Sequence, residues 1–372
     1  VDPEGLILFA FDGTGNTEAS RSNVYWLREA YDDNDLTRDD DGEPLAQANR
    51  PFYIEGPGTS ALLDNGLAYT LPIRVNEQHH RLDRYIKAKW EYETAKLGNR
   101  FTPNTPLRIT LDLIGFSRGA AAARSFANQV IQRNISAYYS KTMWGYAPDS
   151  SLQHCIAVDI RFMGLFDTVL SKAPDGFDLS VSSHIGHVAH AVAVNEHRAL
   201  FPLESVETTY ADRGFGPNTI EIGFIGAHAD IGGGYLEQDG GDLSDVALNW
   251  MWDRMVAAGV PMNPLDDAQR RISAPTLHDE TLTGLWSIPG FGGLTSDREV
   301  RYPDRMLAQR AAEPAHGMTW SLSQSFITYH PRDEPQDPYA AIVDIPCCGN
   351  NAGIVNMQAY AEWLATLGVT IQ

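Results

Sequence analysis

Apolar residues along the chain form two patterns, short uninterrupted runs and longer stretches in which they recur every three or four positions. The short runs are rich in aliphatic and aromatic side chains and end near glycine, proline or aspartate, which is typical of buried strands. They predict strands at residues 6–11, 52–54, 107–114, 156–166 and 220–226.

The longer stretches have the spacing of helices that bury one face. Ser22 and Ser244 each precede such a segment and are expected to cap a helix. A run of small residues opens another helix directly after the strand at 107–114. The predicted helices run from Ser22 to residue 31 and cover residues 73–97, 120–131, 188–194, 246–258 and 354–367.

Strands and helices therefore alternate through most of the chain. This order predicts an α/β fold with a mainly parallel sheet and helices on both faces. We expect residues 1–372 to form a single domain. Proline and glycine accumulate at about 261–332, where the periodicity fades, which predicts an irregular insertion or lid-like region within that domain.

Gly115-Phe116-Ser117-Arg118-Gly119 joins the strongest predicted strand to the helix that follows. A GxSxG sequence in this context is typical of a nucleophile elbow, a sharp turn that presents a serine hydroxyl and needs glycine on both sides to relieve crowding. The positive N-terminal end of the helix would stabilise an oxyanion nearby. Ser117 is therefore the candidate nucleophile, and a purely structural turn is the alternative.

A serine hydroxyl needs a base to take its proton and a carboxylate to orient that base. In the α/β-hydrolase fold the acid and then the histidine follow the serine along the chain, each near the carboxyl end of a strand. Asp167 follows the strand at 156–166, and His228 follows the strand at 220–226. Asp230 is a rival acid, but it comes after His228 and breaks this order. A helix cap or turn for Asp167, and a packing role for His228, are the alternatives.

An oxyanion hole needs the backbone N–H of the residue after the nucleophile, here Arg118, and a second N–H from a loop after an early strand. The loop at 12–16 is the best source, and Gly13 or Thr14 would donate. Asp12 is expected to brace this loop rather than to react. Neither an aspartic-protease motif nor a phosphate-binding glycine loop fits these residues.

The net charge of the chain bears on whether nucleic acid or a membrane can be a binding partner. The chain has 28 Lys and Arg against 48 Asp and Glu, a formal net charge of -20, which excludes the clustered basic surface that nucleic acid requires. An anionic membrane would repel this charge, so we expect any peripheral membrane contact through apolar loops or at a neutral interface. No apolar stretch is long enough to span a bilayer. We expect a soluble protein without a visible signal peptide, and either a cytoplasmic or an exported protein fits this sequence.

No metal ion or cofactor is expected. The acidic loop at 29–43 does not fit the calcium-loop spacing, because Ala48 falls at the position of the bidentate ligand. The three cysteines form no paired metal motif. Four histidines at near-helical spacing lack a cysteine or a regular acidic partner, so surface or packing roles are favoured for His184, His187, His190 and His197.

Seven motifs occur in a fixed order along the chain. They are FDGTGN at 11–16, SNV at 22–24, YIEGPGT at 53–59, GFSRGA at 115–120, FDTV at 166–169, NEHR at 195–198 and GAHADIGGGY at 226–235. As an ordered set they resemble the α/β-hydrolase family, formerly of unknown function, that includes the catalytic domain of lipase and phospholipase effectors delivered by bacterial type VI secretion.

Residue by residue, this resemblance implies Ser117 as nucleophile, Asp167 as acid and His228 as base, in agreement with their positions at strand ends. It also implies an immunity or delivery protein as a partner. The chain departs from the family pattern at Asn195, where an aspartate is common, and around Gly56, where a Gly-Val-Gly sequence is usual.

We expect a serine hydrolase that cleaves carboxylic esters of lipids, a phospholipase or lipase, through a Ser-His-Asp acyl-enzyme mechanism. A carboxylesterase or thioesterase acting on soluble acyl substrates is one alternative. A non-catalytic interaction module on a hydrolase scaffold is the other. An apolar, glycine-hinged stretch is the candidate lid or acyl-chain wall, with an ordinary packed loop as its alternative, and its residues are Trp286, Ile288, Phe291 and Leu294.

Overall fold

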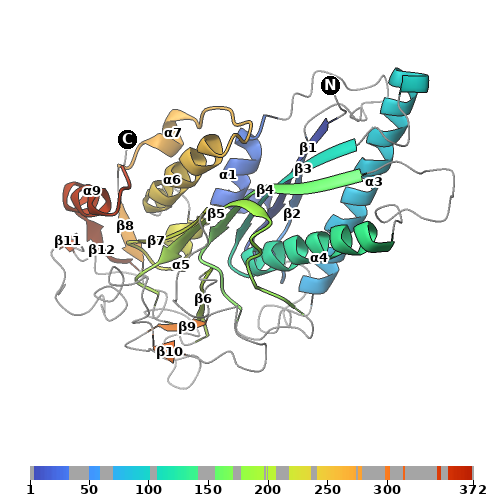
Figure 1. The fold of residues 1–372 in the computed structure, drawn as a ribbon. Helices are drawn as coiled ribbons and strands as arrows, with labels where there is room; N and C mark the ends of the chain where they lie inside the picture. Colours follow the sequence, from blue (N-terminus) through green and yellow to red (C-terminus); the bar gives the residue numbers. More distant parts are fainter. Residues whose placement is uncertain are drawn as a thin grey trace.

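A six-stranded sheet forms the centre of the molecule in the computed structural model, with the strand order β2-β1-β3-β4-β5-β7 (Figure 1). Every neighbouring pair of strands in it is parallel. The strands are β1 (Glu4–Phe11), β2 (Arg50–Ile54), β3 (Leu107–Phe116), β4 (Ile156–Phe166), β5 (Ile185–Ala193) and β7 (Thr219–Phe224). The structure describes residues 4–32, 50–58, 70–100, 107–140, 156–170, 177–196, 198, 200–206, 218–235, 241–273, 275–278, 298–301, 313–314, 342–344 and 351–370.

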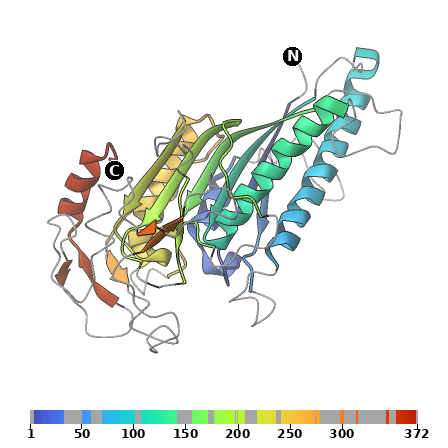
Figure 2. The ribbon, with the colours of Figure 1, turned by 60° about the horizontal axis from the view of Figure 1, so that its bottom comes forward.

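Helices cover both faces of this sheet (Figures 1 and 2). Neighbouring strand residues point to opposite faces, so Phe9 joins the apolar cluster on one face and Leu8 the cluster on the other. Two covered faces require strands that are apolar almost throughout, as these are. The predicted parallel sheet with helices on both faces is confirmed. One face carries α3 (Leu71–Leu97) and α4 (Arg118–Ser140), and the other carries α1 (Asn23–Ala30) and α6 (Ser244–Ala257).

Two small sheets accompany the main one. The first contains β6 (Leu203–Glu204), β9 (Glu299–Arg301) and β10 (Glu313–Pro314), and the second contains β8 (Thr276–His278), β11 (Ile342–Asp344) and β12 (Asn351–Val355). The remaining elements are η1 (Glu18–Ser20), η2 (Gly98–Arg100), α5 (His228–Gly232), η4 (Gly241–Leu243), α7 (Asp267–Arg270) and α9 (Met357–Thr366).

The last helix supports the sheet edge from a distance. The backbone N–H of Ile225, directly after β7, donates to the hydroxyl of Tyr360 on α9 at 2.9 Å. Tyr360 is fully buried, which raises its pKa and keeps the hydroxyl neutral. The chain entering α5 is therefore held by a residue near the end of the described chain.

Some predicted elements are wrong. The segment expected as a helix at 188–194 belongs to β5, because a short apolar run looks alike in a buried strand and in a buried helix. Ser244 does not cap α6, since its hydroxyl donates to the carbonyl of Gly241 at 2.9 Å. The helix predicted at 354–367 begins only after Asn356, and the two residues before Asn356 end strand β12.

The helix cap at Ser22 is confirmed, because its hydroxyl accepts the N–H of Tyr25 at 3.2 Å. Among the described helices, none combines the length and the hydropathy that a membrane crossing requires. Most of the expected insertion at 261–332 lies outside the described residues. The same holds for the four residues of the candidate acyl-chain wall, so that assignment stays a prediction for Trp286, Ile288, Phe291 and Leu294.

Candidate active site

Ser117 occupies a strained turn between β3 and α4. Its φ of 58° lies in the left-handed region that glycine favours, and such strain is a feature of functional sites. A side chain at Gly115 would meet the backbone of Ala120 at 2.7 Å, and one at Gly119 would meet the carbonyl of Asp12 at 2.3 Å. Both glycines are therefore required by close backbone approach, as the elbow interpretation expects.

Phe116 joins this turn to two distant loops. A side chain at Gly13 would lie 2.5 Å from its ring, and one at Gly232 would lie 2.1 Å from it. The ring centroid of Phe116 is also 4.6 Å from that of His228. Two motifs far apart in the sequence, at 11–16 and 226–235, thus pack on one aromatic side chain.

Asp167 lies beside the turn, at the end of the neighbouring strand β4. The backbone N–H of Ser117 donates to the carbonyl of Phe166 at 2.9 Å, and the N–H of Val169 donates to the carbonyl of Ser117 at 3.4 Å. Asp167 also has a positive φ, of 40°. The candidate nucleophile and the candidate acid are therefore held on adjacent strand ends.

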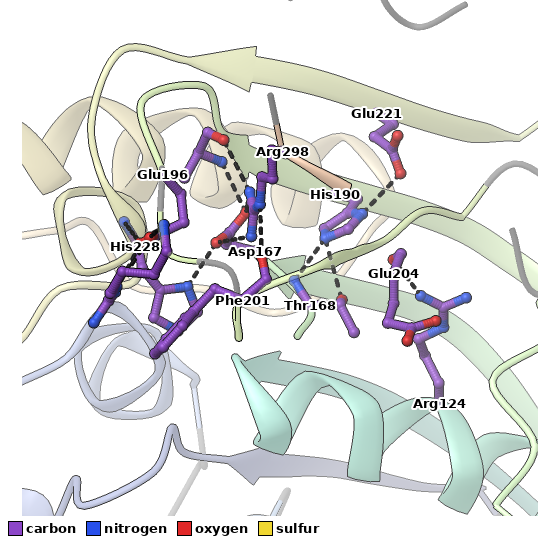
Figure 3. Close-up of polar contacts among 12 residues, drawn as sticks. Arg124, Asp167, Thr168, His190, Glu196, Phe201, Glu204, Glu221, His228 and Arg298 are labelled. Atoms are coloured by element: carbon purple, nitrogen blue, oxygen red, sulfur yellow. Dashed lines mark hydrogen bonds and ion pairs between the residues drawn. The ribbon is translucent and has the colours of Figure 1, made fainter. Parts of the chain in front are cut away.

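His228, the first residue of α5, meets Asp167 across the sheet edge (Figure 3). Its Nδ1 lies 2.6 Å from Oδ2 of Asp167. The other carboxylate oxygen accepts the backbone N–H of Ala193 at 2.9 Å. The structure thus brings together two residues that lie at the ends of different strands and that the sequence predicted as partners.

A buried cation also binds Asp167. Arg298 donates from Nη1 to Oδ1 at 2.7 Å and from Nη2 to Oδ2 at 2.9 Å (Figure 3). Burial alone would raise the pKa of Asp167, but Arg298 and His228 outweigh it and hold this pKa well below its ordinary value. Asp167 is therefore a carboxylate at neutral pH, so Nδ1 of His228 carries the proton between them.

The imidazole of His228 is buried, with only 6% of the residue exposed. Burial lowers its pKa, and the bond to Asp167 opposes this only in part. The ring packs between Phe116 and Phe201, whose centroid lies 5.0 Å away in an edge-on contact. A neutral imidazole with Nδ1 protonated has a free electron pair on Nε2, the form that a general base requires.

Glu196 and Arg198 form an ion pair behind this histidine. Arg198 donates to both carboxylate oxygens, at 2.9 and 2.7 Å, and its guanidinium lies 3.6 Å from the ring centroid of Phe201. Burial raises the pKa of Glu196, but the charge of Arg198 outweighs it and lowers the pKa to about 2. Glu196 Oε2 accepts the backbone N–H of His228 at 3.3 Å and thereby fixes the start of α5.

The loop after β1 is organised around Asp12. Its carboxylate accepts the hydroxyls of Ser22 and Tyr53 at 2.7 and 2.6 Å and the side-chain amide of Asn16 at 3.1 Å. The backbone N–H of Gly13 also donates to it, at 2.6 Å. Asp12 therefore braces the loop. Of the two predicted oxyanion donors, the N–H of Gly13 is therefore already engaged by Asp12.

Asp230, the rival acid, serves another histidine. Its Oδ1 lies 2.6 Å from Nδ1 of His278, and its Oδ2 accepts the N–H groups of Ala227 and His278, each at 3.0 Å. Tyr235 stacks on the ring of His278 at a centroid distance of 3.9 Å. The geometry therefore agrees with Asp167, and not Asp230, as the partner of His228.

The histidine cluster is spread along a strand rather than along a helix. His190 is fully buried and bonds Glu221 through Nδ1 at 2.8 Å, while His184 is exposed in the turn before β5. Within the described residues, no group of three or more histidine, cysteine or acidic side chains is placed to hold a metal ion. His197 lies outside them.

Two functional contacts were missed in the sequence. Glu196 lies in the NEHR motif, so the motif marked its position without indicating its contact to the backbone of His228. Arg298 lies in a stretch without periodicity, and its partner Asp167 is far away in the sequence. No local pattern could have indicated that pair.

Comparisons with known proteins agree with these motifs. Residues 140–254 match the family described as T6SS, phospholipase effector Tle1-like, catalytic domain. The resemblance seen in the sequence is confirmed. Asp167 and His228 lie inside this Tle1-like segment, whereas Ser117 precedes it and Arg298 follows it.

One solved structure shows a related fold. The Tle1 effector, in a structure where it is bound to the VgrG spike from the type VI secretion system, is similar at 20% identity with a TM-score of 0.50, over 75% of this chain and 78% of that chain. An uncharacterized protein from Pseudomonas aeruginosa is similar at 21% identity with a TM-score of 0.47, over 70% of this chain and 47% of that one. The first likeness confirms the α/β-hydrolase fold class. The search of curated proteins gave no match.

Proposed function

We propose that the protein is a serine hydrolase that cleaves carboxylic esters of lipids, with Ser117, His228 and Asp167 as its catalytic residues. The observation that carries the proposal is the 2.6 Å bond between His228 Nδ1 and Asp167 Oδ2 at the sheet edge where the Ser117 turn also lies. An acid, a base and a strained serine at one edge of a parallel sheet are what acyl transfer requires.

In this mechanism Ser117 Oγ attacks the ester carbonyl carbon while Nε2 of His228 takes its proton. Asp167 keeps Nδ1 protonated and stabilises the imidazolium that forms. His228 then returns the proton to the leaving alcohol, which departs and leaves an acyl-enzyme. Water, activated by the same imidazole, cleaves the acyl-enzyme and restores the serine.

The oxyanion of each tetrahedral intermediate needs two donors. We assign them to the backbone N–H groups of Arg118, at the N-terminus of α4, and Thr14. Gly13 N–H is the weaker candidate, because it donates to the Asp12 carboxylate at 2.6 Å. Preorganised donors of this kind each contribute ~10²-fold to 10³-fold in kcat.

A lipid substrate is supported by two observations. The segment that contains Asp167 and His228 matches a phospholipase effector catalytic domain. The base is also flanked by the rings of Phe116 and Phe201, and the neighbouring Leu200 is 48% exposed. Apolar rings beside the base suit an acyl chain, and the exposed Leu200 would contact a lipid interface.

The experiment compares Ser117→Ala with the parent protein, and Ser125→Ala as control. Ser125 is a buried serine of α4 whose hydroxyl accepts the side-chain amide of Gln129. We expect a fluorophosphonate probe to label the parent and S125A but not S117A, and ester hydrolysis to fall by ~10⁴-fold or more in S117A alone. Equal labelling of S117A would refute Ser117 as the nucleophile.

A substrate panel separates the alternatives. Hydrolysis of micellar phospholipid well above that of short soluble esters supports the lipid assignment, and the reverse order identifies a soluble carboxylesterase or thioesterase. A folded parent protein that neither reacts with the probe nor cleaves any ester is instead a non-catalytic module.

Delivery by a secretion spike is a separate proposal. It is supported by the structure of the similar Tle1 effector bound to the VgrG spike. We expect this chain to co-elute with a VgrG-type spike from the same organism in size-exclusion chromatography, and separate elution at micromolar concentrations would contradict the proposal.

A further inference from the structure

Arg298 connects three parts of the site, at Asp167, Ala193 and Phe201, although it lies 131 residues after Asp167 in the sequence. It precedes β9, which pairs with β6, and only 2% of it is exposed. Besides its two bonds to Asp167, it donates from Nη1 to the carbonyl of Ala193 at 2.9 Å and from Nε to the carbonyl of Phe201 at 2.9 Å. The guanidinium is thus oriented by two carbonyls on either side of the carboxylate.

The pair with Asp167 has the geometry of a bidentate clamp. Two parallel N–H···O bonds fix both the position and the plane of a carboxylate. His228 Nδ1 then approaches Oδ2 of a group that cannot rotate. A buried charge pair of this kind is costly to form, so its presence at the acid calls for a functional explanation.

The charge of Arg298 reaches the base through Asp167. Three charged groups act on His228: Asp167 from the end of β4, and Glu196 and Arg198 from the segment after β5. Arg298, before β9, bonds the first of them. Asp230, in α5 itself, is bonded to His278. The positive charge of Arg298, bonded to Asp167, offsets part of the attraction that the Asp167 carboxylate exerts on an imidazolium.

We propose that Arg298 is a positioning residue for the catalytic acid, which fixes the Asp167 carboxylate for His228 and limits the basicity of that histidine. The inference rests on the proposed function, because it takes Asp167 and His228 to be the acid and the base. Arg298 itself touches neither the substrate nor the reacting atoms.

The first test is the pH profile of kcat/KM for Arg298→Gln and Arg298→Lys. In R298Q the uncompensated Asp167 stabilises the imidazolium, so the acid limb should move up by ~1 pH unit. Loss of the clamp should lower kcat by ~10-fold to 10²-fold. R298K keeps the positive charge but not the planar guanidinium that bonds both carboxylate oxygens. Its kcat should therefore fall, while the acid limb of the kcat/KM profile moves by less than ~0.3 pH unit.

Arg161→Gln is the matched control. Arg161 also binds a buried carboxylate with two nitrogens, Asp112 at 3.0 and 2.5 Å. It lies in β4, roughly 17 Å before the carboxyl end of the strand at ~3.3 Å per residue. R161Q therefore reproduces the loss of a two-nitrogen ion pair to a buried carboxylate, and we expect the acid limb of its kcat/KM profile to coincide with that of the parent.

The second test needs no catalysis. The titration of His228 is followed by NMR in the Ser117→Ala background, with and without R298Q. A midpoint ~1 unit higher in the double variant supports the inference even where the parent cleaves no ester, so failure of the proposed function is distinguishable. An unmoved midpoint in folded protein overturns the inference. If R298Q does not fold, R298K is used in its place. An unchanged kcat in R298K would overturn the inference.

Discussion

His228 lies beyond the carboxyl end of the main sheet, at the start of α5, whereas His190 lies within strand β5. Each bonds a buried carboxylate through Nδ1. Their second nitrogens differ. Nε2 of His190 accepts the backbone N–H of Thr168 at 3.0 Å and lies 3.1 Å from its hydroxyl (Figure 3). Among the described residues, the ring hydrogen bonds of His228 involve Nδ1 alone. A histidine–carboxylate pair can therefore act as a base only where the other nitrogen is left to take a proton from the nucleophile.

Glu221 shows what the His190–Glu221 pair does instead of chemistry. Its carboxylate accepts hydrogen bonds from Nδ1 of His190, from the backbone N–H of Val206 at 2.7 Å and from the hydroxyl of Ser205 at 3.0 Å. Through His190 this network fixes Thr168, the residue directly after Asp167. One pair is suited to chemistry and the other to holding the strand end in place.

The largest effect is expected from His228→Asn. Removal of the base should lower kcat by ~10⁴-fold or more, because no other group takes the serine proton. The free energy of unfolding should change little by comparison. Steady-state hydrolysis and urea denaturation of the same preparation measure both, and substantial residual activity would break the proposed difference between the two histidines.

His190→Asn should have the opposite profile. It leaves the Glu221 carboxylate buried without its histidine, so the free energy of unfolding should fall by ~3 kcal/mol. The kcat of the folded fraction should fall by less than ~10-fold, since no reacting atom is removed. A loss of kcat as large as that of H228N, in folded protein, would show that the His190–Glu221 pair takes part in the chemistry.

The pH dependence sharpens the comparison further. Burial lowers the pKa of His228, with Asp167 opposing in part, so the imidazole stays neutral below pH 6.5. A general base is inactive when protonated, so kcat/KM should fall only once the pH drops below this ordinary histidine value. A kcat/KM profile between pH 4 and 9 measures the midpoint. A midpoint above 6.5 would contradict the environment described for His228.

The smallest effect is expected from Asp230→Asn, which perturbs a third pair. Asp230 bonds His278 and the N–H of Ala227, the residue before His228. Loss of about 1 kcal/mol of hydrogen bonding there should lower kcat about 5-fold through the position of α5. A loss as large as that of Asp167→Asn, in the same hydrolysis assay, would make Asp230 the acid.

The sequence predicted the parts of this site that follow local rules. Ser117 was found from a turn motif between a strand and a helix, and Asp167 and His228 from their positions after apolar strands. The segment 188–194 was misjudged because a short buried run has the same composition in a strand and in a helix. Its strand identity depends on β4 and β7 on either side, which no local window contains.

The contacts that tune the site could not be predicted for a related reason. Arg298 reaches Asp167 across a large separation in sequence, and one arginine in an aperiodic stretch carries no signal of its partner. The choice between Gly13 and Thr14 depends on which way the Asp12 carboxylate turns. Orientation of this kind follows from packing around Ser22 and Tyr53 rather than from spacing.

The bond between Ile225 and Tyr360 has a consequence for the smallest active piece of this chain. A shortened protein that ends at residue 254, with the matched family segment, would retain Asp167 and His228. It would lack Tyr360, which receives the N–H of Ile225 three residues before the base. The strand end that leads to His228 would then lose both this hydrogen bond and the apolar side chains of α9 that pack in the same cluster as Ile225. Helix α9 therefore belongs to the part of the chain that the proposed activity requires, and truncation at residue 254 should yield a piece that holds Asp167 and His228 but not their alignment.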